Sequence, residues 1–421
     1  MNAPSEPLVI YTELTTTIGS PWTTGVQRVV REIVPRLIDD DRFDVRPVMW
    51  CEGCRDFRRL TASDHDLLRH PVPGPSRVRT DGTRQQRGIA FAKKYVSPVV
   101  PRIAKKALRR SRFALLQRRS HDEAKHSVEP VSVWPAGSIF FEIEAGWQCP
   151  VPRTALLRTL AQQRISVVAI VNDVMPITHP QFFERRLTKV FTTWFGAVAT
   201  HATAILAISH FTKREIQRLG ATKPVQVVTY GSDFPALIPQ PVEGLGSRPY
   251  MLCVATLEPR KNHALLLDAF DQLRANGHDV SLVLVGRKGW RTDTLVARIR
   301  SHPGFGSYLH WFDTMSDGQL DDLYRGAVLV AFPSWCEGFG LPVIEALQRS
   351  TPVISSTGGA LPEAGGAFAT YVAPDDLPGW VDAIGTALDH PKSVPGGFEA
   401  TSWKTTADSI ADLLASLDRA I

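Results

Sequence analysis

A chain of 421 residues with 43% hydrophobic and 21% charged side chains can bury a large core. This excludes an intrinsically disordered protein, a collagen-like fibre and a disulfide-stabilised mini-protein, and the length predicts two or three domains. The formal net charge of +6 is unevenly spread, because residues 84–119 hold twelve Lys and Arg and no Asp or Glu. Without this segment the remaining 36 basic residues are outnumbered by 42 acidic ones, so the rest of the chain is acidic.

Short apolar runs rich in β-branched residues recur along the chain, and each is followed by a helical pattern. This alternation predicts parallel strands covered on both faces by helices. We expect an α/β protein with two doubly wound, Rossmann-like domains, 1–235 and 250–400. A linker at 236–249 joins them, and a helix at 401–421 packs back toward the amino-terminal domain. The expected strands are 8–11, 45–50, 139–143, 167–171, 204–208, 225–228, 251–255, 281–285, 308–312, 328–332 and 352–355.

The cysteines and the apolar stretches indicate the cellular compartment in which the protein is expected. Five cysteines are too few for a disulfide framework in a chain this long, which favours a reducing cytosol. Cys51 and Cys54 form a CxxC pair without a second pair or nearby His ligands, so a metal or redox role is disfavoured. The first residues lack basic and apolar segments, and we expect no signal peptide. The uncharged run at 190–212 predicts a helix and a buried strand better than a membrane span.

In parallel α/β sheets ligands bind beyond the carboxyl ends of the strands, so the loops there are the places to look for chemistry. A loop rich in Thr and Gly follows the first strand and leads to Gly25, where a helix with an apolar face begins. A glycine at a helix start lets backbone N–H groups approach an anion. Asp173 follows the strand at 167–171 and is a second candidate for a ligand contact. The competing explanation for this residue is an Asx turn or an N-cap before Pro176.

A second polar loop follows the expected strand at 251–255 and places Arg260 and Lys261 side by side. Two adjacent cations suit a diphosphate, because Arg offers a planar fork of donors and Lys a movable point charge. A solvated helix start explains the pair equally well on this segment alone.

The loop after the strand at 328–332 carries a stronger pattern, EGFGLP at 337–342. Its Gly-x-Gly turn leads into a helix that we expect to start near Pro342, a residue suited to the first helical position. The amino terminus of that helix offers N–H groups to a phosphate. Glu345, one turn inside, has apolar neighbours, so its carboxylate needs a partner such as a pair of ligand hydroxyls. The alternative is that Glu345 lies on the wet side of the helix.

Together these residues resemble the signature of retaining family 4 glycosyltransferases of the GT-B fold. Glu337 and Glu345 form an E-x7-E motif in the setting Glu-Gly-Phe-Gly-Leu-Pro-x-x-Glu-Ala. The resemblance to this family covers roughly residues 165–376. Other segments in that range that match the family lie at 208–215, 230–233, 257–262 and 358–363. Residues 24–31 are similar to the amino-terminal segment of a subgroup of bacterial polysaccharide mannosyl- and rhamnosyltransferases.

The resemblance implies a nucleotide-diphosphate sugar held mainly by the carboxyl-terminal domain, with the acceptor on the amino-terminal domain. Arg260 and Lys261 would neutralise the diphosphate and assist catalysis. Glu337 would lie against the transferred sugar, and Glu345 would accept hydrogen bonds from the ribose hydroxyls.

Backbone contacts to the donor are also implied by the resemblance. Gly25 would close on the diphosphate from the amino-terminal domain. Such enzymes need no metal and no other cofactor, because the cations and the helix terminus supply the electrostatic stabilisation. Retention is explained there by same-face attack in which the departing phosphate takes the acceptor proton, so no dedicated base is nominated. Contacts to phosphate or sugar oxygens are expected from Gly338, Phe339, Gly340 and Leu341.

One position departs from the pattern of many relatives, which place a His after the amino-domain strand that faces the sugar. This chain has Asn172 and Asp173 there. Either Asp173 takes over acceptor or sugar contacts, which makes it a catalytic candidate, or His179 does.

The basic segment 84–119 contains a stretch, 101–119, in which apolar residues recur at helical spacing among Arg and Lys. This predicts a basic amphipathic helix suited to an anionic membrane surface. Nucleic-acid binding and packing on the amino-terminal domain are alternatives. Because the resemblance points to enzymes that extend lipid-linked glycans, we expect a cytoplasmic protein bound peripherally to the inner face of the cell membrane.

Three classes of function compete. A glycosyltransferase explains both domains, the cation pair and the two glutamates. It would move mannose or rhamnose to a growing, lipid-linked bacterial polysaccharide or glycolipid. A nicotinamide-dependent dehydrogenase would need a Gly-x-Gly-x-x-Gly after a strand, which the sequence lacks. A nucleic-acid- or anionic-polymer-binding protein without transferase activity would explain only residues 84–119, so no nucleic-acid partner is expected.

Overall fold

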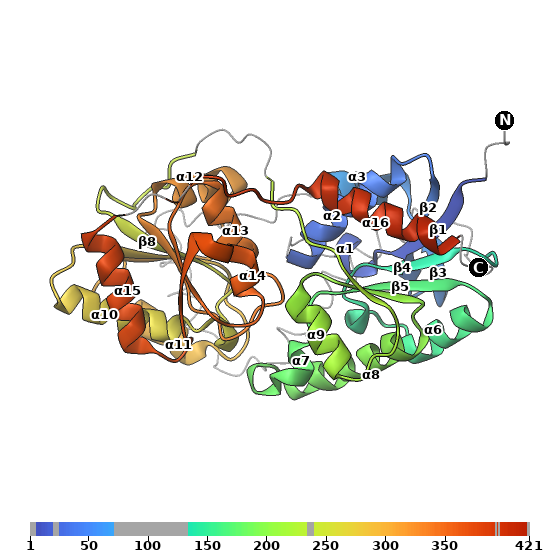
Figure 1. Ribbon diagram of the computed structural model, residues 1–421, viewed down its shortest axis with the longest axis horizontal. Coiled ribbons are helices and arrows are strands. Elements are labelled where there is room, and N and C mark those ends of the chain that lie inside the picture. The colour runs from blue at the N-terminus through green and yellow to red at the C-terminus, as the bar shows by residue number, and fades with distance from the viewer. Residues whose placement is uncertain are drawn as a thin grey trace, which may run out of the picture. The chain divides into compact units, whose positions relative to one another are not determined.

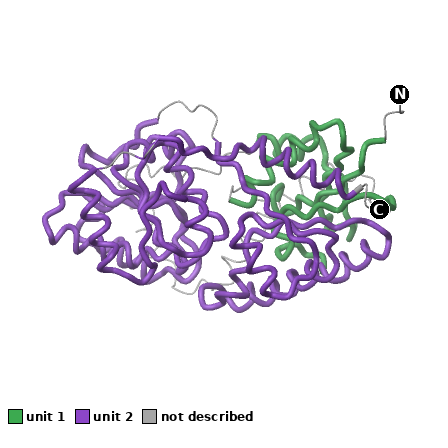
Figure 2. The backbone as a smooth tube through the Cα atoms, viewed as in Figure 1, with its two compact units in different colours: residues 1–152 green, residues 153–421 purple. Residues whose placement is uncertain are grey.

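The structure is a computed structural model that describes residues 6–19, 25–70, 134–233, 240–391, 394 and 396–418. The basic segment 84–119 lies outside the described residues, so the predicted amphipathic helix remains a prediction. The chain divides into two compact units, Met1–Pro152 and Arg153–Ile421, and each is described by itself (Figure 2).

The described part of unit 1 contains four neighbouring strands in the order β3-β2-β1-β4. Figure 1 labels these strands. β1 runs parallel to β2 and to β4, with Leu8 opposite Phe43 and Ile10 opposite Ile139. β3 is antiparallel to β2 and is missing from the expected strands, because Phe57 is its single apolar residue. The elements are β1 (Leu8–Glu13), α1 (Thr15–Ile18), α2 (Gly25–Ile38), β2 (Phe43–Cys51), β3 (Asp56–Arg59), α3 (Ala62–Arg69), β4 (Ile139–Glu142) and a 3-10 turn, η1 (Gly146–Gln148).

Unit 2 begins with three parallel strands in the order β5-β6-β7. Every residue of β5 and β6 is buried, as expected for strands covered on both faces. The uncharged run at 190–212 forms the end of α8 and β6, as predicted, and no described helix is long and apolar enough to cross a membrane. The elements are α6 (Arg153–Gln162), β5 (Ser166–Val171), α7 (Met175–Thr178), η2 (Pro180–Phe182), α8 (Arg185–His201), β6 (Ala204–Ala207), α9 (His210–Arg218) and β7 (Val225–Val227).

Unit 2 continues with a six-stranded parallel sheet in the order β10-β9-β8-β11-β12-β13. Its first strands are β8 (Tyr250–Val254), β9 (Ser281–Val285) and β10 (Leu309–Phe312). The others are β11 (Leu329–Phe332), β12 (Val353–Ser356) and β13 (Ala369–Val372). The strand order reverses between β8 and β11, which is where ligands bind in such sheets.

The strands β1–β7 belong to one sheet and β8–β13 to the other, which confirms the prediction of two Rossmann-like α/β domains with parallel sheets. The short strand β13 was not expected, because its residues are half exposed and do not form a continuous apolar run. The helices around the second sheet are α10 (His263–Ala275), α11 (Asp293–Ser301), α12 (Asp317–Gly326), α13 (Leu341–Gln348), α14 (Leu361–Gly365) and α15 (Leu377–Asp389), with 3-10 turns η3 (Pro259–Lys261) and η4 (Gly366–Phe368).

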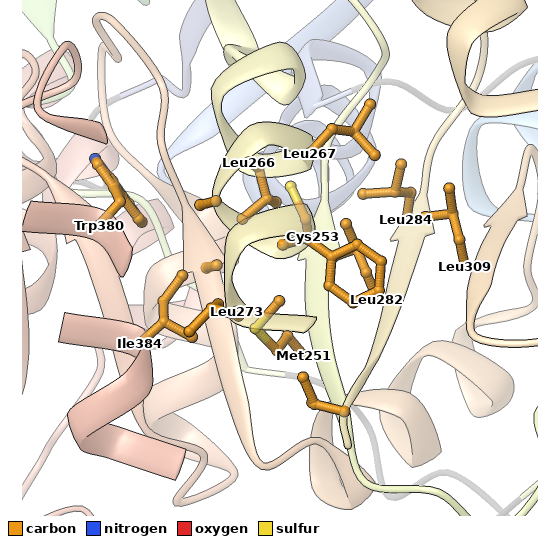
Figure 3. Close-up of a cluster of buried hydrophobic side chains, with 14 of the residues drawn as sticks. Met251, Cys253, Leu266, Leu267, Leu273, Leu282, Leu284, Leu309, Trp380 and Ile384 are labelled. Carbon is orange, nitrogen blue, oxygen red and sulfur yellow. The ribbon is translucent and has the colours of Figure 1, made fainter. Parts of the chain in front are cut away.

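A buried apolar cluster holds the second sheet to its helices (Figure 3). Met251 and Cys253 of β8 contribute to it, as do Leu266 of α10 and Trp380 of α15, all with no exposed surface. Removing this much apolar surface from water is the main stabilising contribution to the sheet-helix layer. The loops at the carboxyl ends of β8 and β11 are thereby carried on a rigid support.

The last helix, α16 (Trp403–Asp418), begins against a turn at 229–233. Trp403 N–H donates to Asp233 over 2.5 Å, and Thr406 Oγ1 donates to the carbonyl of Thr229 over 2.8 Å. A Cβ on Gly231 would lie 2.2 Å from the backbone nitrogen of Trp403. Only glycine fits this contact.

Candidate active site

The loops that follow β8 and β11 are joined by backbone and amide hydrogen bonds. Trp335 N–H donates to the carbonyl of Arg260 over 2.8 Å, and Asn262 Nδ2 donates to the carbonyl of Pro333 over 3.2 Å. Asn262 takes a left-handed backbone with φ of 56°, which ends η3 and starts α10. This turn places Arg260 and Lys261 against the loop at 333–340.

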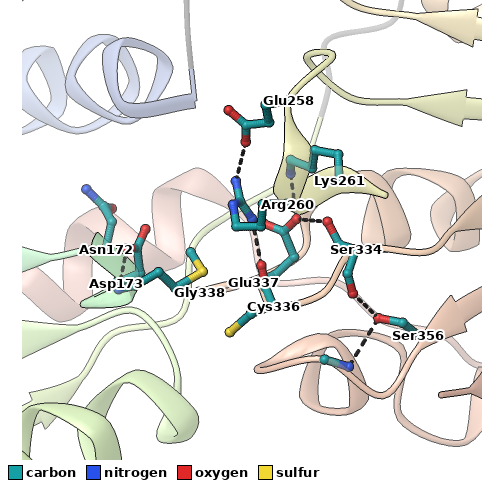
Figure 4. A network of polar contacts seen from close by, with 12 residues as sticks. Asn172, Asp173, Glu258, Arg260, Lys261, Ser334, Cys336, Glu337, Gly338 and Ser356 are labelled. Carbon is teal, nitrogen blue, oxygen red and sulfur yellow. Dashed lines mark hydrogen bonds and ion pairs between the residues drawn. The ribbon is translucent and has the colours of Figure 1, made fainter. Parts of the chain in front are cut away.

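Glu337 is the centre of a buried charge cluster (Figure 4). Its Oε2 lies 2.6 Å from Arg260 Nη1, and its Oε1 lies 2.6 Å from Lys261 Nζ. Arg260 Nη2 also pairs with Glu258 at 2.7 Å, and Ser334 Oγ donates to Glu337 Oε1. The side chains of Arg260, Lys261 and Glu337 are 10–13% exposed, so water screens these attractions only weakly. The structure therefore brings together three of the predicted site residues.

The cluster controls the protonation of Glu337. Burial alone would raise the pKa of this carboxyl, but the charges of Arg260 and Lys261 outweigh burial and lower the pKa to about 2. Burial would lower the pKa of Arg260, and Glu337 and Glu258 reverse the effect and raise it. Glu337 and Arg260 therefore both carry their charges at neutral pH.

Arg260 keeps one donor unused. Its Nη1 also donates to the carbonyl of Cys336 over 2.7 Å. Its Nε is buried and has no hydrogen-bond partner among the described residues. A buried N–H without a partner is costly, and a ligand oxygen would remove that cost.

Gly338 and Gly340 are required by backbone geometry. A Cβ on Gly338 would lie 2.2 Å from the carbonyl oxygen of Asn172. Gly340 has φ of 114° and precedes α13, which starts at Leu341 as predicted. The ring of Phe339 lies edge-on to Tyr230, with centroids 5.9 Å apart. The segment 338–341, whose backbone is predicted to contact the donor, thus leads into the amino terminus of α13.

Asp173 lies next to Gly338, and its Oδ1 accepts the N–H of Met175 over 3.0 Å, which is the Asx turn considered from the sequence. Burial raises the pKa of Asp173, opposed by the charge of Arg260. Asn172 accepts the hydroxyl of Tyr230 over 2.6 Å. His179 shares a 2.8 Å hydrogen bond with the hydroxyl of Thr178.

Glu345 is 5% exposed, so the alternative that it lies on the wet side of its helix is wrong. Its Oε2 accepts the hydroxyl of Tyr324 over 2.8 Å. Burial raises the pKa of Tyr324 well above its usual value, and the charge of Glu345 adds to this, so the phenol stays a donor. Glu345 therefore has a protein partner that sequence reasoning missed, because Tyr324 belongs to a different helix.

Gly25 is described within unit 1, where it is exposed and starts α2. A Cβ there would have no neighbour within 4 Å among the described residues, so their packing does not require glycine. The contact of Gly25 with the donor stays a prediction.

Two further polar residues of the loops were not found from the sequence. Ser334 is buried, and its carbonyl accepts the hydroxyl of Ser356, which ties the loop after β11 to β12. His263 is buried at the start of α10, and neither of its ring nitrogens has a hydrogen-bond partner in the part of the chain that the structure describes. Burial and the charge of Lys261 lower the pKa of His263 to about 3, so it is neutral.

Known proteins resemble this chain in sequence. A profile of the family described as "Glycosyl transferases group 1" matches residues 239–393. The MMP alpha-(1→4)-mannosyltransferase of Mycolicibacterium hassiacum is 30% identical over an alignment of 295 residues, which covers 64% of this chain and 68% of that protein. The chain belongs to the glycosyl transferases group 1 family.

A second relative is a much longer protein than this chain. The serotype-specific mannosyltransferase WbdA of Escherichia coli is 30% identical over 273 residues. The match covers 59% of this chain but 33% of WbdA, so the chain spans about a third of the length of that relative.

Solved structures show the same GT-B fold. Anabaena HepE in complex with UDP and glucose has a TM-score of 0.61 at 15% identity and covers 97% of this chain and 100% of HepE. Sucrose-phosphate synthase from Thermosynechococcus elongatus has a TM-score of 0.62 at 15% identity. This match covers 98% of the present chain and 100% of the synthase. The fold prediction is confirmed by these likenesses.

The pKa of Glu337 predicts how the stability of the protein depends on pH. The ion pairs stabilise the fold fully above the ordinary carboxyl pKa of 4.5, and this contribution is lost as pH falls toward 2. Glu337→Gln should therefore be less stable than wild type at pH 7, by a margin that shrinks on acidification. The pH-dependent part of that margin should approach about 3 kcal/mol, measured by urea unfolding at a series of pH values.

Glu184→Gln is the matched control, because Glu184 is exposed and its side chain does not cap α8. This control should show the same pH dependence as wild type. A margin for Glu337→Gln that stays constant between pH 7 and pH 3 would contradict the assignment.

Proposed function

We propose that the chain is a retaining, metal-independent glycosyltransferase. It moves mannose, or rhamnose, from a nucleotide-diphosphate sugar to a growing, lipid-linked bacterial polysaccharide or glycolipid. The observation that carries the proposal is the buried cluster of Arg260, Lys261 and Glu337 at the strand-order reversal of a glycosyl transferases group 1 protein.

The cations are the groups that would hold the diphosphate. Arg260 and Lys261 already lie in place because Glu337 holds them, so little side-chain entropy is lost when an anion binds. The unpartnered Nε of Arg260 supplies a further N–H. Because Glu337 already pairs with both cations, an incoming diphosphate shares them with this carboxylate. That carboxylate is then beside the phosphate, where the sugar is attached.

The turn at Gly338 and Gly340 supports the same interpretation. Leu341 starts α13, so its N–H has no partner within the helix, whereas Val343 N–H donates to the carbonyl of Gly340 over 3.0 Å. The helix dipole favours an anion at this end. Phosphate oxygens would be bound by this backbone from Gly338 to Leu341. Such fixed dipoles and cations stabilise a departing diphosphate without a metal ion.

Glu345 would accept the hydroxyls of the donor ribose. Its hydrogen bond from Tyr324 fixes the carboxylate orientation inside an apolar helix face. A carboxylate offers about four acceptor sites on its two oxygens, so Glu345 can accept a ligand hydroxyl as well as the hydroxyl of Tyr324.

Asp173 is proposed to contact the acceptor or the transferred sugar. It lies beside Gly338, and the charges of Arg260 and Glu337 both act on it. Its raised pKa follows mainly from burial. Attack on the same face as the departing phosphate, with the phosphate taking the acceptor proton, needs no separate base.

The names of two relatives favour mannose as the sugar. WbdA and the Mycolicibacterium hassiacum enzyme are both named mannosyltransferases. HepE was crystallised with UDP and glucose, so both GDP- and UDP-sugars belong in the donor test.

The donor-site assignment predicts the effect of two substitutions. Arg260→Ala and Glu345→Ala should each weaken binding of GDP-mannose by roughly tenfold to a hundredfold, because each removes hydrogen bonds that involve a charged group. Isothermal calorimetry with GDP-mannose and UDP-glucose measures the loss and identifies the preferred nucleotide. Arg218→Ala and Glu184→Ala, both at exposed positions, are the matched controls and should bind like wild type. Unchanged affinity in the folded Arg260 and Glu345 variants would remove these residues from the donor site.

The mechanism predicts the product and the metal requirement. NMR of the product should show the anomeric configuration of the donor, because attack occurs on the face from which the phosphate leaves. Activity should persist in EDTA, since Arg260, Lys261 and the start of α13 supply the positive potential. An inverted anomeric centre would refute retention, and activity lost in EDTA and restored by manganese or magnesium would refute metal independence.

We also propose that residues 84–119 dock the enzyme on the anionic inner leaflet, near a lipid-linked acceptor, from the cytoplasmic side. The support is the sequence, which concentrates twelve cations there while the rest of the chain is acidic. An anionic lipid surface attracts such a segment, by on the order of 1 kcal/mol per cation close to the surface.

Membrane docking predicts salt-sensitive sedimentation with anionic liposomes. Wild type should sediment at low salt and be released at high salt, because added ions screen the attraction. Replacing five cations by Gln should abolish sedimentation and leave GDP-mannose binding unchanged. If wild type ignores anionic vesicles at low salt, or if the replacements weaken donor binding as severely, the docking proposal fails. The five positions are Arg102, Lys105, Lys106, Arg109 and Arg110.

A further inference from the structure

Two cysteine thiols face each other in the turn between β2 and β3 of unit 1. β2 ends at Cys51 and β3 begins at Asp56, and these two residues are partners in the antiparallel register. The sulfur atoms of Cys51 and Cys54 lie 2.9 Å apart, and Cys54 N–H donates to Cys51 Sγ over 3.3 Å. The left-handed backbone of Arg55, with φ of 51°, helps to close the turn. The hairpin therefore brings the two sulfur atoms together before any bond forms between them.

The two thiols differ in their access to solvent. Cys54 is exposed, whereas Cys51 is buried with 6% of its surface accessible. A soluble reagent can reach Cys54, and the intermediate formed there is within reach of Cys51. This is the arrangement of a thiol that reacts first and a second thiol that resolves the product.

We propose that Cys51 and Cys54 form a reversible redox site that exchanges with a small-molecule disulfide such as oxidised glutathione. The thiolate of Cys54 attacks one sulfur of that disulfide, forms a mixed disulfide and releases one small thiol. Cys51 then attacks the sulfur of Cys54, which forms the Cys51–Cys54 bond and releases the second small thiol. Two protein thiols are oxidised, one small disulfide is reduced to two thiols, and the two cysteine protons end on the released thiols.

The geometry favours the second step over capture of another molecule. A disulfide has an S–S length of about 2.0 Å, so the sulfur atoms need to approach by less than an ångström. Holding the two groups in one turn makes the reaction intramolecular, which raises its effective concentration. The sequence alone disfavoured a role because the CxxC pattern lacked metal ligands, and the proximity of the two sulfurs in a hairpin is what the structure adds.

The surroundings of Cys54, above all its hydrogen bond with Cys51, determine how the exchange depends on pH. The hydrogen bond with Cys51 raises the pKa of Cys54, burial and the charge of Asp56 act in the same direction, and Arg58 opposes them. Because the thiolate is the attacking species, the first step should accelerate as pH rises through the alkaline range.

The site is connected to the interior of unit 1. Trp50 N–H, one residue before Cys51, donates to Thr15 Oγ1 over 2.8 Å. Thr15 in turn donates to Glu13 over 2.7 Å, and Glu13 ends β1 at the carboxyl edge of the sheet. The dithiol therefore lies beside the edge at which ligands of parallel sheets bind.

The test uses the full-length protein in buffers of oxidised and reduced glutathione, followed by alkylation and peptide mass spectrometry. In oxidising buffer, the peptide with Cys51 and Cys54 should lose the mass of two hydrogen atoms and resist alkylation. Excess reduced glutathione should restore both thiols. Cys51→Ser should instead accumulate a glutathione adduct on Cys54, because the resolving thiol is gone.

Two controls keep the outcome decisive. Cys54→Ser changes an exposed residue and should slow modification of Cys51 by about tenfold or more, because the remaining thiol is shielded. Cys149→Ser should react like wild type, since the thiol of Cys149 donates to Glu13 over 2.6 Å. If wild type accumulates the same glutathione adduct as Cys51→Ser, or if both thiols remain fully alkylated in oxidising buffer, the proposal is wrong.

Discussion

The pairing of the buried Glu337 carboxylate with two cations is the interaction on which the candidate site depends. A charge at this depth would cost several kcal/mol if it were unpaired, and Arg260 and Lys261 remove that cost by direct contact. The contrast with Lys404 and Asp408 is instructive. That pair is 2.6 Å apart but exposed on α16, where water and salt reduce such an interaction to a few tenths of a kcal/mol. Glu337 therefore constrains the geometry of its loops in a way that surface pairs do not.

Close backbone packing makes this pairing possible. A Cβ on Gly359 would lie 2.3 Å from the carbonyl oxygen of Glu337, and one on Gly358 would lie 2.4 Å from that of Trp335. The glycines let the loop after β12 lie directly on the loop after β11, where Ala360 N–H donates to Glu337 O over 2.9 Å. The backbone of Glu337 is thus held from one side and its carboxylate from the other, so the charges are in position before any ligand arrives.

The two units carry different chemistry on the same type of scaffold. In unit 2 the residues after β8 and β11 form a largely buried cluster of charges held by ion pairs, which suits binding and stabilising a charged leaving group. In unit 1 the residue that ends β2 is a cysteine next to a second, exposed cysteine, which suits electron exchange with small thiols. Both sets follow the carboxyl ends of parallel strands, because that edge is where a doubly wound sheet leaves its loops open to ligands. The two proposals can therefore fail independently.

The sequence by itself determined the α/β class, nearly all strands of both sheets and the position of α13, because continuous apolar runs and a Gly-x-Gly-x-Pro turn are local signals. It also singled out Arg260, Lys261, Glu337 and Glu345 through their place after such runs. It missed β3 and β13, whose residues are polar or half exposed and become strands only by pairing with a neighbour.

Only the tertiary structure decided which side chains contact one another. Tyr324 reaches Glu345 from α12, and Ser334 and the two cations converge on one carboxylate from separate loops. The sulfur contact of Cys51 and Cys54 likewise needs the hairpin that β3 closes. Partners of this kind depend on which strands lie side by side, and no local pattern encodes that order.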